Sequence, residues 1–351
     1  MAKRGNLPKK TLAAVLIKLK APLELLELDI PELQAGQLLV RVSMAGLCRT
    51  QLSEANGLKG EDKYLPHLLG HEAVGEVVEV GPKVKTVKAK DTVVMSWIKG
   101  TGMDVPGGIF NHQGKKINAG GVAVFTQYAV VAENRVTKIS KAVPLDVASL
   151  LGCAVATGAG IVKNTLAVRP GSSIAIFGIG GVGGMALLMA KALKCRPLIA
   201  IDVQPKKLAW AKKLGAAHTI NSAIQDVAGV MAEIVPGGVD YAVEASGIPA
   251  VMELAFANIK NTGVLAIAGH PEPGKTIQID PFELIKGKRI VGTWGGGTNP
   301  DIDVPFYIKL HKSGKLPVEK LVSHRFALKD INKAMKVLSG GEAGRIVIDC
   351  E

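Results

Sequence analysis

A glycine cluster in the middle of the chain, Gly178-Ile-Gly180-Gly-Val-Gly183, is the feature that most restricts the fold. It follows a short apolar run at 173–178 and precedes a segment of helical composition at 185–193. A second apolar run ends on Asp202, 19 residues after Gly183. A strand, a glycine turn, a helix and a second strand with a terminal acid form the βαβ unit of a parallel sheet that binds a dinucleotide.

The residue types of this cluster suit that role. Glycines permit the tight turn, the close approach of a pyrophosphate and the packing of helix on strand, and the helix N-terminus stabilises the phosphates. The alternative is a plain glycine-rich turn, with the acid at the end of the second strand as a surface residue. The candidate cofactor-binding residues are Gly178, Gly180, Gly181, Val182 and Gly183.

Asp202 bears on the choice of cofactor. Its carboxylate would bind the adenosine ribose hydroxyls, and it favours NAD over NADP because a 2′-phosphate would meet a like charge. Lys206 and Lys207 follow closely. Cations there could accept a phosphate, so they weaken the preference, and Lys207 joins the candidate cofactor-binding residues.

Strand and helix patterns divide the chain. Short β-rich runs at 38–43, 73–80, 93–97 and 122–131 predict an all-β, barrel-like unit over the first 150 residues. After about residue 155 the pattern changes to strands that alternate with helices, which predicts βαβ units and a parallel sheet. The runs in that part are apolar at 173–178, 198–202, 240–244 and 263–269, helical at 185–193, 206–214 and 330–338, and again apolar at 345–349.

Composition limits the classes of protein that remain. The chain has 351 residues, 48% of them hydrophobic, which excludes a disordered chain and favours about two domains. No apolar stretch approaches the ~18 residues of a transmembrane helix. Its four cysteines, Cys48, Cys153, Cys195 and Cys350, are too few for a disulfide scaffold, so a reducing, cytoplasmic setting is expected.

The formal net charge of +13 raises the question of nucleic acid. The chain shows no RRM, helix-turn-helix or zinc-finger motif, and its lysines are dispersed rather than interleaved with aromatic residues. A basic nucleic-acid-binding protein therefore remains only an alternative. The excess charge is most simply a solvated surface that helps to capture an anionic dinucleotide or substrate.

Four residues are candidate metal ligands: Cys48, His71, Glu72 and Cys153. They are scattered, so their spacing does not define a zinc site. A lone cysteine is more often a small buried hydrophobe, and a lone histidine is more often a satisfied polar residue. His67 lies four residues before His71, but the intervening Leu-Leu-Gly disfavours a helix, so we interpret His67 as a non-ligand.

Three segments together resemble a known family, the zinc-dependent medium-chain alcohol dehydrogenases of the medium-chain dehydrogenase/reductase superfamily. The segments are Gly70-His71-Glu72-Ala-Val-Gly75, followed by Gly81 and Val84; Gly46-Leu-Cys48-Arg49-Thr50; and Gly152-Cys153, followed by Thr157-Gly158. The resemblance covers nearly the whole chain, in order. It implies an α/β fold with a β-rich part: a GroES-like catalytic domain at 1–155, a Rossmann doubly wound parallel-sheet domain at 156–297, and a return to the catalytic domain at 298–351.

The resemblance also implies the chemistry. Cys48, His71 and Cys153 would hold one catalytic Zn²⁺ per subunit, with Glu72 beside it and able to exchange into its shell, and the fourth position stays open for water or substrate. Zinc would polarise the oxygen of an alcohol, or of its aldehyde or ketone, while hydride passes between the substrate and NAD(H). Thr50 would relay the alcohol proton.

Two positions depart from the family pattern. Ser53 stands where some members have a histidine that completes the proton relay, so Ser53 would act through water or have no part. Gln51 stands where an aspartate usually accepts the second N–H of the zinc-bound histidine. A glutamine can accept this bond but carries no charge, so His71 should be less basic.

Further cofactor contacts follow from matched positions. Arg49 and Arg345 would contact the pyrophosphate, for which bidentate arginine geometry is suited. Thr157 would pack on the nicotinamide, and Ser246 and Gly269 belong to loops that would line the cofactor. For each residue a plain surface or packing role remains the alternative.

The substrate is left open. Trp97 matches a family position on the wall of the substrate pocket. This match does not distinguish between a simple alcohol, an aromatic alcohol and a polyol as the substrate. A polyol or amino-alcohol (threonine-like) dehydrogenase of the same superfamily is the nearest alternative. The expected partners are a small-molecule alcohol or carbonyl substrate and further copies of the chain, as a dimer or tetramer, with no nucleic acid and no membrane.

Residues 98–120 contain no cysteine, whereas many family members bind a structural zinc there through four closely spaced cysteines. Without thiolates one zinc per subunit is expected. The segment is expected to be a mobile or partner-packed loop.

Overall fold

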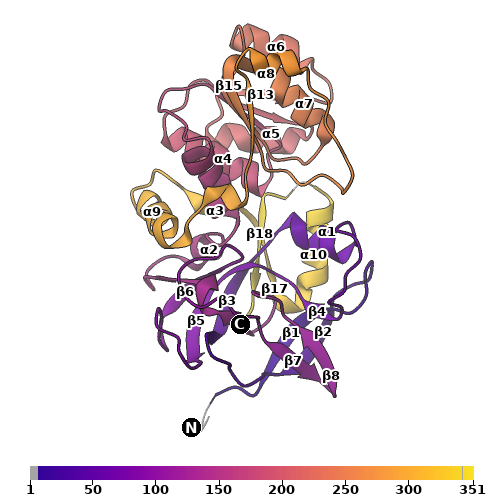
Figure 1. The fold of residues 1–351 in the computed structure, drawn as a ribbon, viewed down its shortest axis with the longest axis vertical. Coiled ribbons are helices and arrows are strands. Elements are labelled where there is room, and N and C mark those ends of the chain that lie inside the picture. Colours follow the sequence, from indigo (N-terminus) through magenta and orange to yellow (C-terminus); the bar gives the residue numbers. More distant parts are fainter. Residues whose placement is uncertain (1–6, 342) are drawn as a thin grey trace. The chain divides into compact units, whose positions relative to one another are not determined.

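The computed structural model describes residues 7–341 and 343–351. The chain divides into two compact units (Figure 1), the first comprising residues 1–153, 299–308 and 322–351 and the second residues 154–298 and 309–321. Among the described residues no helix is both long and apolar enough to cross a membrane.

The first unit is built mainly of β-strands, as its β-rich runs predict. A closed barrel has the strand order β1-β2-β7-β8-β4, and a second sheet has the order β10-β6-β5-β3-β18-β17, with β9 also paired to β3. The strands are β1 (Lys10–Leu16), β2 (Glu24–Asp29), β3 (Gln37–Leu47), β4 (His67–Leu68), β5 (Glu72–Val80), β6 (Thr92–Ser96), β7 (Ile109–His112), β8 (Lys115–Asn118), β9 (Tyr128–Ala132), β10 (Val136–Ile139), β17 (Val322–Ala327) and β18 (Arg345–Asp349).

The last strand of the chain completes the sheet that its first half begins. β18 pairs antiparallel with β3, so that Ile348 lies opposite Ala45. Val40, Val42 and Ile346 belong to one buried cluster with them. Burial of these β-branched side chains holds the C-terminal strand against the N-terminal half of the unit.

Short helices connect the strands of the first unit. They are α1 (Arg49–Ala55), η1 (Glu133–Arg135), α2 (Leu145–Ala148), η5 (Leu328–Asp330) and α10 (Ile331–Ser339). Helix α9 (Pro300–Lys312) begins in the first unit, and its last residues belong to the second. The helix expected at 330–338 is thus confirmed as α10, whereas α1 lacks an apolar periodicity that could have predicted it.

The strand expected at 122–131 is only partly correct, because β9 begins at Tyr128. The backbone N–H groups of the residues before it find hydrogen-bond partners outside a regular β-ladder. Val124 and Phe125 both donate to the Leu69 carbonyl at 3.1 Å, and Gln127 donates to the Leu12 carbonyl at 3.0 Å. Tertiary contacts therefore replace strand pairing in this stretch.

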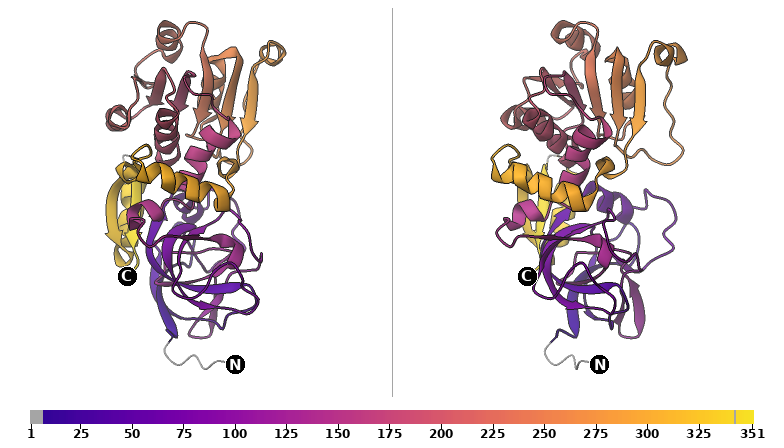
Figure 2. Two further views of the ribbon diagram at one scale, coloured as in Figure 1. Left: turned by 90° about the vertical axis from the view of Figure 1, so that its left-hand side faces the viewer. Right: turned by 60° about the vertical axis from the view of Figure 1, so that its left-hand side comes forward.

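The second unit contains a parallel sheet with the order β13-β12-β11-β14-β15-β16. Figure 2 shows this part of the chain, coloured from magenta to orange, from two further sides. Its strands are β11 (Ile174–Phe177), β12 (Leu198–Asp202), β13 (His218–Asn221), β14 (Val239–Glu244), β15 (Ile259–Ile267) and β16 (Arg289–Gly292). β11 and β12 are buried at every position, as expected of parallel strands covered on both faces. This strand order is that of the Rossmann fold, so the parallel sheet predicted from the sequence is confirmed.

Helices alternate with these strands. They are α3 (Ala154–Gly160), η2 (Ile161–Thr165), α4 (Gly181–Ala192), α5 (Pro205–Leu214), α6 (Val227–Ile234), α7 (Pro249–Ala257), α8 (Pro281–Ile285), η3 (Gly295–Gly297) and η4 (Val318–Leu321). The helix expected from residue 185 begins at Gly181, because the glycine cluster itself forms its first turn. The order of the strands reverses between β11 and β14, and this reversal is where doubly wound sheets bind ligands.

We expected a loop over residues 98–120, and this expectation is wrong for the second half of the segment. β7 and β8 form a hairpin there, with β7 paired to β2 and β8 paired to β4 in the closed barrel. The first half is fastened by polar bonds, since Glu133 accepts hydrogen bonds from the N–H groups of Met103, Lys85 and Thr86 at 2.9, 2.6 and 2.8 Å. Strand pairing and the Glu133 carboxylate thus fix this segment, which has no cysteines to bind a structural zinc.

Candidate active site

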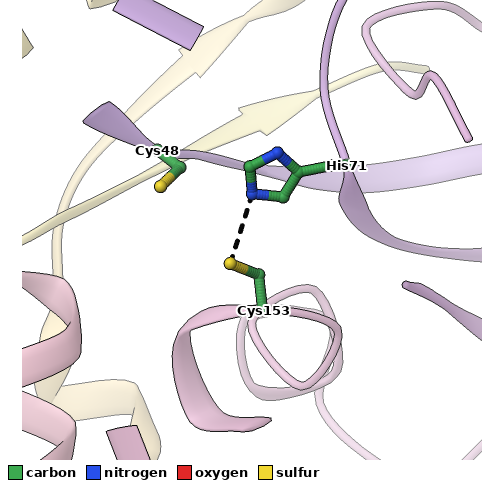
Figure 3. A group of neighbouring side chains, drawn as sticks. All are labelled: Cys48, His71 and Cys153. Carbon is green, nitrogen blue, oxygen red and sulfur yellow. Dashed lines mark hydrogen bonds between the residues drawn. The ribbon is translucent and has the colours of Figure 1, made fainter. Parts of the chain in front are cut away.

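Three donor side chains converge from separate segments of the first unit (Figure 3). Cys48 follows β3 and precedes α1, His71 precedes β5, and Cys153 directly precedes α3. One ligand atom of each lies within 4.8 Å of the other two. The structure therefore brings together three of the four predicted metal ligands, which are scattered over more than one hundred positions of the sequence.

The chain around His71 needs a glycine to make this approach. Gly70 has φ +93°, a conformation that L side chains rarely adopt. A Cβ there would lie 2.8 Å from the Val124 side chain and 2.9 Å from that of Phe125. The glycine before the histidine therefore allows the turn that carries the imidazole to the two cysteines.

The donor set fits zinc. His71 Nε2 lies 3.2 Å from Cys153 Sγ, close to the edge of about 3.6 Å that usual Zn–N and Zn–S lengths give in a tetrahedron. Two sulfurs and one imidazole supply three ligands, and a catalytic zinc site keeps its fourth position open. The group of donors does not include Glu72.

Neighbouring groups favour the thiolate of Cys48. A hydrogen bond from Cys153 lowers its pKa well below the ordinary thiol value, and His71 and Arg345 lower it further, against the opposing effect of burial. Because a metal binds the thiolate rather than the thiol, this shift prepares Cys48 as a ligand.

Gln51 connects two of the donors. Its Oε1 accepts a hydrogen bond from the Cys48 N–H at 2.9 Å, and its Nε2 lies 2.5 Å from His71 Nδ1. The amide nitrogen thus faces the imidazole, whereas the sequence led us to expect the amide oxygen there. With this orientation of the amide, Nδ1 would accept the bond, which requires the ring proton on Nε2.

Glu72 and Arg345 form an ion pair behind this site. Glu72 is completely buried and Arg345 is 4% exposed. The family resemblance makes Glu72 a candidate ligand and Arg345 a candidate pyrophosphate contact. In the structure each charge neutralises the other, and the guanidinium contributes to the low pKa of Cys48.

The remaining predicted residues of this region lie on α1. Thr50 Oγ1 lies 3.6 Å from Cys48 Sγ. Arg49 is exposed and Ser53 is partly buried on the same helix. The first turn of α1 therefore places the predicted relay hydroxyl next to the donor cluster.

A cavity of about 590 Å³ opens beside His71 and Gln51, within the first unit. Trp97 lies on its wall, as expected for a pocket residue. Arg135 lies there too, and it was not among the predicted residues because a single arginine after a β-rich run carries no signal. His67 also lies on the wall. Its Nε2 lies 2.8 Å from Asp62 Oδ2 and its Nδ1 2.9 Å from the Leu68 carbonyl, so both ring nitrogens are engaged away from the donor cluster.

The glycine cluster of the second unit forms the turn between β11 and α4. Gly178 has φ +89°, and a Cβ at Gly183 would lie 1.9 Å from the Gly178 carbonyl oxygen. A Cβ at Gly180, by contrast, would meet nothing within 4 Å. Two positions thus need glycine for the turn, while Gly180 leaves open space before the helix, as a cradle for phosphates requires.

Asp202 ends β12 and is held rigidly. Its Oδ2 accepts a hydrogen bond from the Ile179 N–H at 2.7 Å and its Oδ1 one from the Gln204 N–H at 2.9 Å. It is 8% exposed, so the alternative of an ordinary surface aspartate is wrong. The carboxylate links the glycine turn to the end of the neighbouring strand.

The other predicted cofactor residues of this unit adjoin the same end of the sheet. The Ser246 N–H and hydroxyl donate to Glu244 Oε1 at 2.6 and 2.5 Å, and Gly269 N–H donates to the Glu244 carbonyl at 3.1 Å. Burial raises the pKa of Glu244, against the effect of these donors. Thr157 lies in α3 and Lys207 in the first turn of α5.

Comparisons with known proteins identify the family of the chain. Residues 34–141 match the family described as "Alcohol dehydrogenase GroES-like domain", and residues 181–313 match "Zinc-binding dehydrogenase". The chain is 33% identical to an S-(hydroxymethyl)glutathione dehydrogenase of Synechocystis, over 97% of this chain and 99% of that protein. A counterpart from Escherichia coli is 32% identical over the same shares.

Solved structures show the same similarity. The benzyl alcohol dehydrogenase of Acinetobacter calcoaceticus superposes with a TM-score of 0.90 at 32% identity, covering 98% of this chain and 100% of that one. An alcohol dehydrogenase zinc-binding domain protein from Burkholderia ambifaria gives a TM-score of 0.91 at 33% identity, covering 97% and 98%.

Proposed function

Since this chain belongs to the zinc-dependent medium-chain alcohol dehydrogenases, we propose that it transfers a hydride between an alcohol and NAD(H). That it is a zinc-dependent alcohol oxidoreductase follows from the family. The nucleic-acid alternative has no support in these comparisons. The observation that carries the proposal is the convergence of Cys48, His71 and Cys153 within 4.8 Å.

These three side chains would hold the zinc. When bound, the metal supplies a Lewis acid that polarises the substrate oxygen and favours loss of the hydroxyl proton. The chain prepares the ligands, because the low pKa of Cys48 keeps its sulfur anionic next to Cys153 and His71. Ligation through His71 Nε2 requires the ring proton on Nδ1, so the Gln51 amide must then turn its oxygen toward the imidazole.

The proton path begins at Thr50. Its Oγ1 lies 3.6 Å from Cys48 Sγ, so the hydroxyl is placed to accept the proton that the substrate loses and to pass its own onward. Ser53 lies one turn further along α1 and would receive it through water. Arg49, exposed on the same helix, would contact the cofactor phosphates.

The glycine turn of the second unit would hold the dinucleotide, which accepts or donates the hydride. Residues 178–183 shape the turn before α4, and Asp202 would bind the adenosine ribose hydroxyls. The carboxylate would repel a 2′-phosphate, which supports NAD rather than NADP. Thr157, Lys207, Ser246, Gly269 and Arg345 remain proposed cofactor contacts.

We further infer a small-molecule alcohol substrate, a cytoplasmic setting and assembly as a homo-oligomer. The four cysteines of the chain are too few for a disulfide scaffold, which is typical of proteins under reducing conditions. The assembly is expected from the family and is checked by light scattering of the purified protein.

The test combines metal analysis with NADH formation. Purified protein should contain one zinc per chain and reduce NAD in the presence of primary, aromatic or sugar alcohols, or of threonine. A preference for sugar alcohols or threonine would select the polyol or amino-alcohol alternative. Full zinc content without NAD or NADP reduction by any alcohol would refute the proposal.

A further inference from the structure

The cavity beside His71 is large for a simple alcohol. Its volume of about 590 Å³ lies in the range of pockets that bury drug-sized ligands. The wall includes the metal-side residues Gln51 and His71, the aromatic Trp97, and the cation Arg135. A substrate that fills it therefore extends well beyond the hydroxyl group that reacts.

Two of the three acidic side chains of the wall are engaged by local partners. Lys59 Nζ lies 3.3 Å from Glu54 Oε2, and His67 Nε2 lies 2.8 Å from Asp62 Oδ2. The remaining acid, Glu61, is exposed to solvent.

Arg135 is different, because its guanidinium is only partly engaged by hydrogen bonds. Its Nη1 donates to the main-chain carbonyl of Trp97, and its Nε is buried without a hydrogen-bond partner. No carboxylate of the described residues lies within ion-pair distance of it, and the nearby Asp104 pairs with Lys99 at 2.6 Å. Burial lowers the pKa of Arg135 and the charge of Asp104 raises it. The effect of burial is the larger, so the nearby carboxylate offsets only part of the cost of removing the cation from water.

The guanidinium lies along the cavity wall at Gly121. A Cβ at Gly121 would lie 3.2 Å from Arg135 Nη2 and 3.4 Å from its Nε. Gly121 is itself part of the wall. A glycine here leaves room for the planar head of the arginine beside the cavity.

We propose that Arg135 binds a carboxylate at the far end of the alcohol substrate, so that the enzyme prefers hydroxy acids to neutral alcohols of the same shape. This rests on the proposed function, since it assigns the substrate class of the same site. The hydroxyl reaches the His71 side of the cavity while the carboxylate takes the free N–H donors of the guanidinium. Arginine suits this role because its fork matches a carboxylate in two points.

The experiment compares two substrates that differ only in charge. kcat/KM is measured on the zinc-loaded enzyme with NAD for para-(hydroxymethyl)benzoate and for para-(hydroxymethyl)benzamide. The wild type should prefer the carboxylate. Arg135→Gln should reduce the carboxylate-to-amide ratio by about 10- to 100-fold, mainly through KM, the range expected for charged hydrogen bonds. Arg135→Lys should fall between.

A matched control is Arg41→Gln. Arg41 is exposed on β3 and lies 3.4 Å from Glu76, away from the cavity wall, so the ratio should not change. If Arg135→Gln lowers kcat/KM equally for both substrates, the arginine has only a structural role and the inference is overturned. A wild type that turns over the amide as well as the acid overturns it too, while the proposed function stands.

A direct binding measurement distinguishes a failure of the proposed function from a failure of the inference about Arg135. If no alcohol is oxidised at all, the proposed function fails, and calorimetric titration with para-methylbenzoate still decides the role of Arg135. Weaker binding by Arg135→Gln than by wild type and Arg41→Gln supports the anion site. Equal binding by all three overturns it.

Discussion

Arg345 of β18 and Glu72 of β5 form an ion pair that is 4% and 0% exposed. The pair connects the last strand of the chain with the segment that carries His71. Because both charges are removed from water, each depends on the other.

Breaking this pair should destabilise the first unit. Arg345→Met or Glu72→Met alone leaves a buried charge without its partner and should cost about 3–5 kcal/mol. The double variant should lose much less than the sum of the two. Denaturant unfolding measures all three, and purely additive losses would contradict a direct coupling between the side chains.

Loss of the Cys48 sulfur should remove the metal. Cys48→Ser is expected to lower zinc content and abolish alcohol oxidation, because an alcohol side chain is a far poorer zinc ligand than a thiolate. Cys195→Ser is the control, since burial raises the pKa of Cys195 to about 11 and it lies outside the donor cluster. Metal analysis of both proteins checks this, and normal zinc in Cys48→Ser would remove Cys48 from the ligand set.

Asp202→Ala should change the choice of cofactor. Removing the carboxylate removes both the proposed ribose contact and the repulsion of a 2′-phosphate, so the ratio of NAD to NADP efficiency should fall by about 10-fold or more. The variant also loses the bond from the Ile179 N–H, so its stability is measured in parallel. An unchanged cofactor ratio in a folded variant would exclude Asp202 from this role.

Glu133 should stabilise the segment around Met103 in a pH-dependent way. Burial raises its pKa, but the N–H groups of Lys85, Met103 and Thr86 outweigh this and lower it below the ordinary 4.5. A lowered native pKa means that the stabilisation is fully present above the unfolded-state value and is lost as the pH falls through the native one.

Glu133→Gln should therefore cost about 1–2 kcal/mol at neutral pH, since an amide oxygen is a weaker acceptor than a carboxylate. The stabilities of wild type and variant should converge in acid. Urea unfolding across the pH range measures both, with Glu319→Gln, on an exposed carboxylate in the second unit, as the control. A difference that does not depend on pH would show that the charge of Glu133 is unimportant.

Local patterns predicted the regular parts of the fold well. The runs at 198–202 and 345–349 coincide with β12 and β18, because apolar strands between turn residues have a clear local signature. The hairpin at β7 and β8 was missed, since its strands are only four residues long and are fixed by pairing with β2 and β4. Strand pairing between distant segments leaves little trace in a local window.

The order of residues alone settles the class of fold, the glycine turn with its acid, and, through family resemblance, the identity of three metal donors. These depend on local chemistry: backbone freedom at glycine, apolar periodicity, and thiol and imidazole side chains. The tertiary structure decides which partner each polar or charged side chain has. It pairs Glu72 with Arg345, turns the Gln51 amide nitrogen toward His71, and places Arg135 on a cavity wall. Such partners come from strands far apart in the chain, and electrostatic energy depends on their distance and burial, which no local pattern encodes.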